Sequence, residues 1–102
     1  MMKPMNQKPA SKNLLLAIIK AVHDLGGTAS LDEIYSHVQK NPSIDLTPYQ
    51  IPESRIRTLI YDHSSDTHRF KGTPGDHRDI FYPIRQKGDG YWGLRINADE
   101  GF

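Results

Sequence analysis

The sequence predicts an α+β fold in which three helices are followed by a β-hairpin. Before residue 64, apolar residues recur every three or four positions in three segments, which is the period of an amphipathic helix. After residue 64 the pattern changes to short β-prone stretches between turns rich in glycine and proline. A chain of 102 residues has room for a single core. We assign residues 11–97 to this domain, 1–10 to a disordered leader and 98–102 to a tail.

The first predicted helix spans residues 12–25. Its apolar residues recur on one helical face, namely Leu15, Ile18, Ile19, Val22 and Leu25. Two glycines at 26–27 end the helix, because glycine readily adopts the left-handed conformation found at helix C-termini. Thr28 and Ala29 then form a short extended piece.

The second predicted helix begins at the sequence SLDE. Ser30 and Glu33 have the spacing of a capping box, in which each side chain satisfies a backbone N–H at the helix start. The apolar stripe comprises Leu31, Ile34, Tyr35 and Val38. The sequence NPS at 41–43 ends the helix, and the segment up to residue 51 is longer than the turn of a tight helix-turn-helix.

The third predicted helix spans residues 52–63. Proline is favoured at the first helical position and an acidic residue in the first turn, as Pro52 and Glu53 provide. The core face is formed by Ile56, Leu59 and Ile60. The opposite face contains no acidic residue and consists of Ser54, Arg57, Thr58 and Tyr61, with Arg55 on its flank.

The remaining chain predicts β-structure. Residues 68–72 are expected to be extended and 72–79 to form a loop. Residues 80–84 (IFYPI) are expected to form either an edge strand or a bulged strand, because they contain a proline. The sequence RQKGDG is a turn, in which Asp-Gly is a strong hairpin signal, and 91–96 form the return strand.

Side chains alternate across the return strand. Leu94 and Ile96 should face the helices, so we expect Trp92 to pack in the core with them. Tyr91 and Arg95 then point outward, and Gly93 leaves room for a bulge or for the close approach of another backbone.

Three helices and a hairpin in this order form a winged helix-turn-helix. In such folds the second helix of the motif enters the major groove of DNA, a role that falls to residues 52–63. Arg57 can form forked hydrogen bonds with guanine, which are worth about 1–3 kcal/mol of discrimination. All six arginines lie in the second half, although the net charge is only +1. The expected major-groove contacts are Ser54, Arg55, Arg57, Thr58 and Tyr61. The expected loop and wing contacts are Arg69, Lys71, Arg78, Arg85, Lys87, Tyr91 and Arg95.

Three stretches, IRTLIYDHSSDTHRFKG, DIFYPI and KGDGYWGLR, carry a resemblance to a known family. They resemble the winged-helix domains appended to bacterial restriction endonucleases, including modification-dependent enzymes. The recurring elements correspond here to Ile56-Arg57, Ser64-Ser65-Asp66, Phe70, Phe81-Tyr82 and residues 88–95. The resemblance implies a sequence- or modification-selective domain that binds double-stranded DNA, including methylated DNA. It also implies a nuclease domain or partner. No nuclease domain is present in this sequence, so the resemblance does not extend to cleavage.

Other chemistry finds little support in the sequence. There is no cysteine, and the spacing of His63, His68 and His77 is not a zinc pattern. We find no paired-carboxylate centre and no phosphate-binding P-loop, so we expect no enzyme activity, metal or cofactor. No apolar run reaches membrane-spanning length, and a cytoplasmic location is expected. The main alternative is a winged-helix module for protein–protein interaction, and a small nuclease or hydrolase is less favoured.

Overall fold

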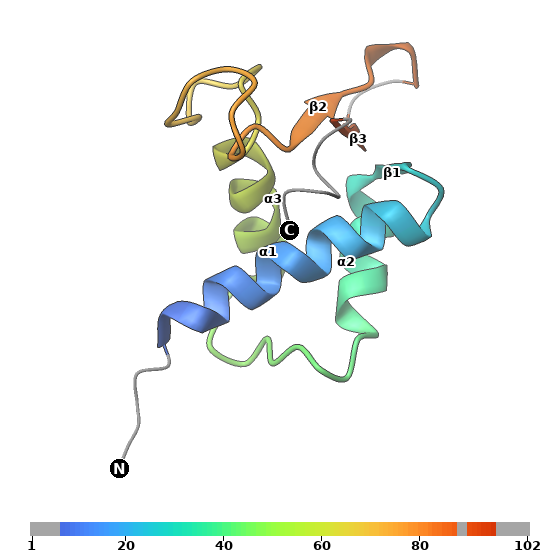
Figure 1. The fold of residues 1–102 in the computed structure, drawn as a ribbon. Coiled ribbons are helices and arrows are strands. Elements are labelled where there is room, and N and C mark those ends of the chain that lie inside the picture. Colours follow the sequence, from blue (N-terminus) through green and yellow to red (C-terminus); the bar gives the residue numbers. More distant parts are fainter. Residues whose placement is uncertain (1–6, 88–89, 96–102) are drawn as a thin grey trace.

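The structure is a computed structural model that describes residues 7–87 and 90–95, with side chains described from residue 12 to 86 and from 90 to 95. It confirms the α+β class. Within the described residues the chain forms three helices, one short 3-10 turn and one three-stranded antiparallel sheet (Figure 1). The elements are α1 (Gln7–Asp24), β1 (Thr28–Ser30), α2 (Leu31–Gln39), α3 (Pro52–Asp62), β2 (Phe81–Pro83), η1 (Arg85–Lys87) and β3 (Tyr91–Leu94).

Helix α1 begins five residues earlier than predicted. Residues 7–10, which we assigned to the leader, are helical. Pro9 does not prevent this because it lies in the first turn, where a backbone N–H has no partner within the helix. Residues 1–6 of the predicted leader and the predicted tail lie outside the described residues.

The predicted glycine stop of α1 is confirmed. Gly26 and Gly27 have φ angles of 103° and 96°, and the Gly27 N–H donates to the Val22 carbonyl at 2.9 Å. The placement of Leu25 on the apolar face was wrong, because this residue lies beyond the helix and is 37% exposed.

Helices α2 and α3 agree closely with the sequence. The Glu33 N–H donates to the Ser30 Oγ at 3.1 Å, and the Ser30 N–H donates to the Glu33 Oε1 at 2.9 Å, so the capping box is present. Helix α3 ends one residue before the predicted end, and its expected core face of Ile56, Leu59 and Ile60 is buried. The connection 40–51 contains no helix or strand and packs Ile44, Leu46 and Tyr49 against the core.

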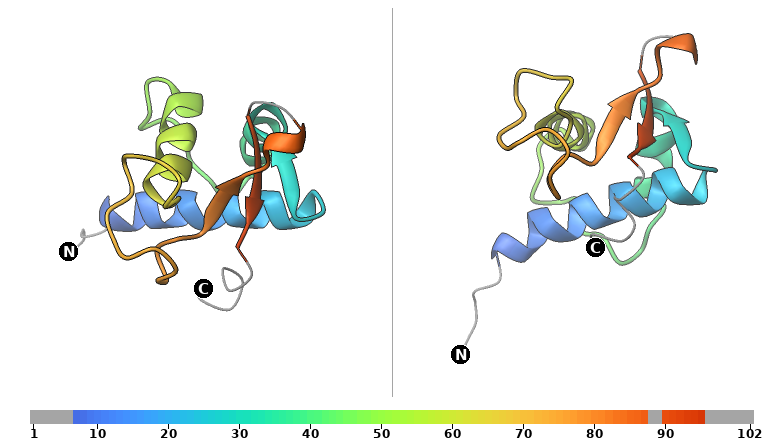
Figure 2. Two further views of the ribbon diagram at one scale, coloured as in Figure 1. Left: turned by 90° about the horizontal axis from the view of Figure 1, so that it is seen from above. Right: turned by 45° about the horizontal axis from the view of Figure 1, so that its top comes forward.

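The sheet has the strand order β1-β3-β2, with β3 in the centre. The edge position predicted for the proline-containing strand is confirmed, since Pro83 lies in β2 and pairs with Trp92. The pairing of β1 with β3 was not predicted. It joins the Thr28–Ser30 strand, which follows α1, to the hairpin, with Ala29 opposite Trp92. Helix α1 runs below the sheet and contacts both α2 and α3 (Figures 1 and 2).

The side chains of β3 agree only in part with the predictions made from the sequence. Trp92 is 6% exposed and belongs to the core, as predicted. Gly93 does allow a close approach, but by side chains and not by another backbone. A Cβ at this position would lie 3.0 Å from the Tyr82 ring and 3.0 Å from Ile84. Ile96 lies outside the described residues.

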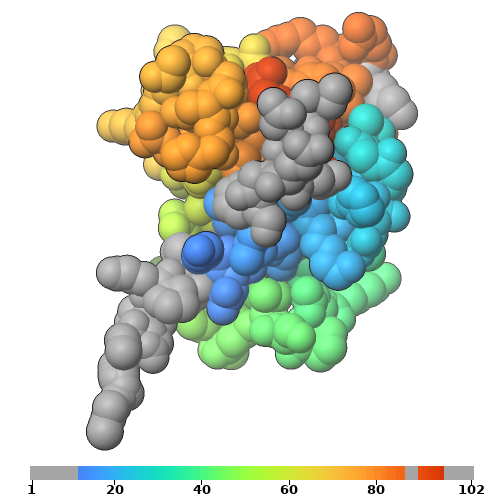
Figure 3. All heavy atoms as spheres, in the orientation of Figure 1, coloured from blue at the N-terminus to red at the C-terminus, as the bar shows by residue number. Residues whose placement is uncertain are grey.

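The extended stretch predicted at 68–72 was wrong. The chain from residue 64 to 79 makes successive turns, in which the Thr67 N–H donates to the Ser64 carbonyl and the Asp76 N–H to the Thr73 carbonyl. Aspartate and serine side chains satisfy further backbone N–H groups here, which favours turns over a strand. We call residues 64–79 the turn loop. It forms a rounded lobe at the upper left of the molecule in Figure 3.

None of the described helices is long and apolar enough to cross a membrane.

Candidate nucleic-acid interface

The predicted contact face of α3 is accessible only in part. Ser54, Arg57, Thr58 and Tyr61 all have intermediate exposure. Arg57 has no carboxylate partner among the described residues, and its Nη2 lies 3.5 Å from the Ser54 Oγ. A guanidinium has five N–H donors, so most donors of Arg57 are uncommitted. This face can therefore present an arginine and two hydroxyl groups to a ligand.

Tyr61 departs from the expected picture because it turns toward the hairpin. Its ring packs against Trp92, with ring centroids 5.6 Å apart and the planes inclined by 43°. Tilted aromatic pairs of this kind are stabilising. Tyr61 thus connects α3 to β3, and only part of its surface remains for a ligand.

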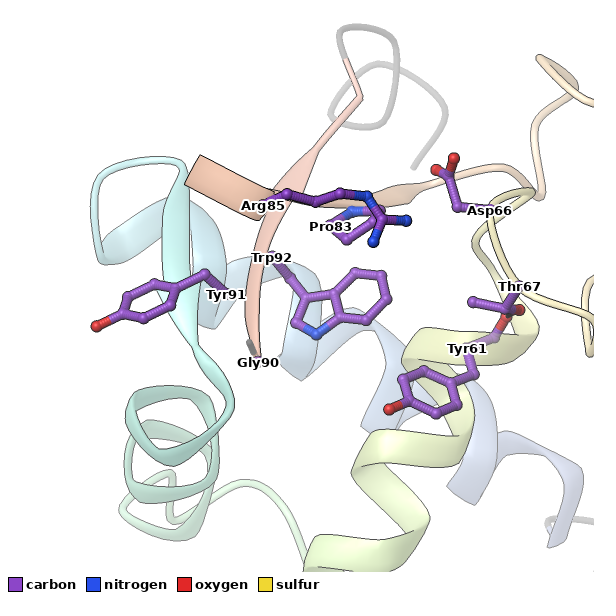
Figure 4. Close-up of a pocket in the computed structure, with 8 residues that line it drawn as sticks. All are labelled: Tyr61, Asp66, Thr67, Pro83, Arg85, Gly90, Tyr91 and Trp92. Carbon is purple, nitrogen blue, oxygen red and sulfur yellow. Dashed lines mark hydrogen bonds between the residues drawn. The ribbon is translucent and has the colours of Figure 1, made fainter. Parts of the chain in front are cut away.

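An open pocket of about 570 Å³ lies between the C-terminal end of α3 and the hairpin. We call it the hairpin pocket (Figure 4). Tyr61 and Trp92 form its aromatic walls, and Asp66 lies at its rim. The side chain of Arg85 runs along Pro83 with its guanidinium group over the pocket. Arg85 is exposed and has no hydrogen bond or ion pair within the described part of the chain.

The other predicted contact residues differ in their surroundings. Tyr91 also lines the hairpin pocket and is half-buried, and its ring lies on the other side of β3 from the Trp92 ring (Figure 4). Lys87 ends η1, but its side chain lies outside the described residues. Arg55, on the flank of α3, is half-buried and has an interaction partner of its own.

Three of the predicted arginine contacts form ion pairs within the protein. Arg69 Nε lies 2.6 Å from the Asp62 Oδ1, and Arg78 Nη2 lies 3.0 Å from the Asp76 Oδ2. The third, Arg95, uses Nε and Nη2 for two carboxylates at 2.8 and 2.6 Å. The carboxylates in these pairs belong to Asp62, Asp76, Asp79 and Asp66. In the structure these aspartates orient the arginines. Lys71 is exposed and has no carboxylate partner among the described residues.

Asp79 is the residue that sequence analysis missed. Its side chain is 2% exposed and accepts hydrogen bonds from the Ser65 N–H, the Gly75 N–H and the Arg95 Nε, each at 2.8 Å. Burial alone would raise its pKa. The two backbone donors and the positive charge of Arg95 outweigh that effect and hold the pKa of Asp79 below its ordinary value.

The Asp79 contacts join the turn loop to the chain just after β3. Arg95 also lies 5.7 Å from the centroid of the Tyr82 ring, so its position is fixed from several sides. The only sequence feature that could have indicated this role is the place of Asp79 between a glycine-rich loop and the apolar strand. Arg95 is therefore a structural anchor, whatever other contacts it makes.

No cluster of three or more histidine, aspartate or glutamate residues suited to a metal ion occurs in the part of the chain that the structure describes. Comparison with family models, with curated proteins and with solved structures gave no match.

Proposed function

We propose that the chain is a winged helix-turn-helix domain that binds double-stranded DNA, with α3 in the major groove and the β2–β3 hairpin on the backbone or in the minor groove. The element order and the position of β2–β3 beside the end of α3 support this fold. The observation that carries the function is the partly exposed Ser54, Arg57 and Thr58 face of α3, whose arginine has no carboxylate partner among the described residues. Hydroxyl and guanidinium groups on such a helix suit base edges and phosphates.

The hairpin supports the second half of this proposal. Arg85 is exposed beside the hairpin pocket, where a backbone phosphate or a narrow minor groove would attract a guanidinium group. The aromatic contact between Tyr61 and Trp92 keeps the hairpin next to α3, so one duplex can meet both elements. Selectivity for a modified base, and a link to a nuclease in a restriction system, rest on the family resemblance.

Substitution of Arg57 tests the role of α3. In a selection from a randomised duplex pool, Arg57→Ala should lose base preference at one or two positions, because each forked contact contributes about 1–3 kcal/mol of discrimination. Lys87→Ala serves as the comparison and should weaken binding evenly across sequences. Running the pool with and without adenine and cytosine methylation measures selectivity for modified bases. Unchanged preference and affinity in both variants would rule out this interface.

A protein-interaction module is the second candidate. Ile51, just before α3, is 60% exposed, and a large exposed apolar side chain suits a protein partner better than DNA. Binding to random duplex at increasing NaCl separates the two functions. DNA binding predicts retention that falls steeply with salt, whereas an interaction module predicts no salt-sensitive retention.

A further inference from the structure

A second open pocket lies on the side of α3 that faces the turn loop. We call it the loop pocket. It has a volume of about 610 Å³ and is lined by Asp62, His63, His68, Arg69, Lys71 and Arg78. Three of these side chains carry a formal positive charge and one carries a negative charge, so its lining is basic although the whole chain is nearly neutral.

The two arginines of the pocket are each paired with a neighbouring aspartate. Asp62 binds Arg69 through Nε, and Asp76 binds Arg78 through Nη2, so each guanidinium keeps further N–H donors. The chain also approaches the second pair closely at Gly72. A Cβ there would lie 2.8 Å from the Asp76 Oδ2 and 3.1 Å from the Arg78 Nε. The pocket therefore contains oriented arginines and not only mobile surface charges.

Lys71 and His68 complete the lining without a partner of their own. Both are exposed, and neither forms a hydrogen bond or ion pair with another described residue. An ammonium group and an imidazole beside two oriented guanidinium groups match the several oxygen atoms of a phosphate, which accepts hydrogen bonds from many directions.

The end of α3 would normally oppose an anion, because its last carbonyl groups carry partial negative charge. His63 reduces this effect. Its Nδ1 lies 2.8 Å from the Leu59 carbonyl, and since a carbonyl oxygen can only accept, Nδ1 donates. One of the last four carbonyl groups of α3, which have no N–H partner within the helix, is thereby satisfied.

The loop pocket and the hairpin pocket lie on different sides of α3. Tyr61 and Asp62 are consecutive and so point about 100° apart around the helix. Tyr61 meets Trp92 of the hairpin, whereas Asp62 meets Arg69 of the turn loop. In Figure 1 the loop curls away from the tip of the hairpin, beyond the C-terminal end of α3.

We infer that the loop pocket binds a phosphate group. With α3 in a major groove, this group would belong to the DNA strand on the side of the groove away from the hairpin. That source depends on the proposed function, whereas the phosphate chemistry of the pocket does not. The other source is a small phosphate compound.

Titration of the full chain with inorganic phosphate tests the pocket itself. Amide resonances of His68, Lys71 and Arg78 should shift with sodium phosphate but not with sodium chloride at equal ionic strength. Lys71→Gln should weaken the phosphate affinity about fivefold to tenfold, as expected for the loss of one charge-assisted hydrogen bond. Lys20→Gln, which removes an exposed lysine of α1, should leave it unchanged. Equal shifts with both salts, or equal affinity in Lys71→Gln, would overturn the inference.

Binding of a short duplex at several NaCl concentrations identifies the source of the phosphate. If the pocket holds a DNA phosphate, Lys71→Gln should reduce the slope of log K against log[NaCl] by about 0.9. An unchanged slope together with phosphate-specific shifts would assign the pocket to a small phosphate compound. If the wild-type chain does not bind duplex at all, the proposed function fails while the phosphate titration still decides the pocket.

Discussion

At the scale of single residues, the stability of the fold depends on which carboxylates pair with the arginines and on how buried those carboxylates are. Arg95 forms ion pairs with both Asp66 and Asp79, but the two aspartates differ in environment: their side chains are 42% and 2% exposed. An exposed ion pair contributes little to stability because water screens it, whereas a buried charge that loses a partner is strongly destabilising. The two contacts should therefore have very different energetic weights, although their lengths are similar.

Substitution of each aspartate measures this difference. At neutral pH, Asp79→Asn should lower the free energy of unfolding by about 2–4 kcal/mol, because it removes the charge that Arg95 faces and one of the acceptors for Ser65 and Gly75. Asp66→Asn should lower it by less than about 1 kcal/mol. Chemical denaturation of both variants gives the comparison. Equal effects would show that Asp79 is not the anchor of the turn loop.

At the scale of elements, local sequence determined what could be predicted. The capping box of α2 and the glycine stop of α1 each involve residues within five positions of one another, so their sequence patterns contain the whole interaction. Long-range contacts have no such pattern. Thr28–Ser30 is too short to show periodicity, and its pairing with β3 depends on residues more than 60 positions away. The Asp79 contacts to Ser65 and Arg95 were missed for the same reason.

In the candidate site, too, features that are local in sequence could be predicted and long-range contacts could not. The row of Ser54, Arg57, Thr58 and Tyr61 follows from helical period alone, so the sequence could indicate it. The contact between Tyr61 and Trp92 depends on where the hairpin lies relative to α3, and this relation is absent from the sequence pattern. Arg69, Lys71 and Arg78 were predicted as contacts, but their grouping in the loop pocket was not, because the pocket forms only when the turn loop folds back to the end of α3.

The hairpin provides an element-scale prediction at Gly93. Gly93→Ala should destabilise the fold by about 1–3 kcal/mol, because the added methyl group would lie 3.0 Å from the Tyr82 ring. In a Tyr82→Ala background the same substitution should cost less, since the ring has been removed. Thermal denaturation of the four proteins completes the double-mutant cycle. An equal cost in both backgrounds would mean that Tyr82 does not limit the space at Gly93.

At the scale of the whole molecule, the turn loop and the sheet form one unit that is held together by ionised carboxylates. Asp76 binds groups within the turn loop, and Asp79 also binds Arg95, which directly follows β3. The N–H of Thr73 is the main cause that lowers the pKa of Asp76, while for Asp79 the backbone donors and Arg95 overcome the effect of burial. A carboxylate with a lowered pKa in the folded state stabilises the fold above its unfolded-state pKa. This contribution is lost as the pH falls through the folded-state value.

Acid unfolding should therefore depend on Asp79. The ordinary aspartate value is 3.8 and the folded-state pKa lies below it, so the stabilisation should be complete near neutral pH and should disappear below about pH 4. Asparagine does not titrate. The difference in unfolding free energy between wild type and Asp79→Asn should therefore narrow as the pH is lowered from neutral through the folded-state pKa of Asp79. Denaturant midpoints measured from pH 7 to pH 2 report this difference. Asp66→Asn again serves as the control, and its difference from wild type should stay small at every pH. A difference of constant size would mean that Asp79 stabilises the fold through its shape and not through its charge, and the carboxylate could not then be the group that joins the turn loop to the sheet.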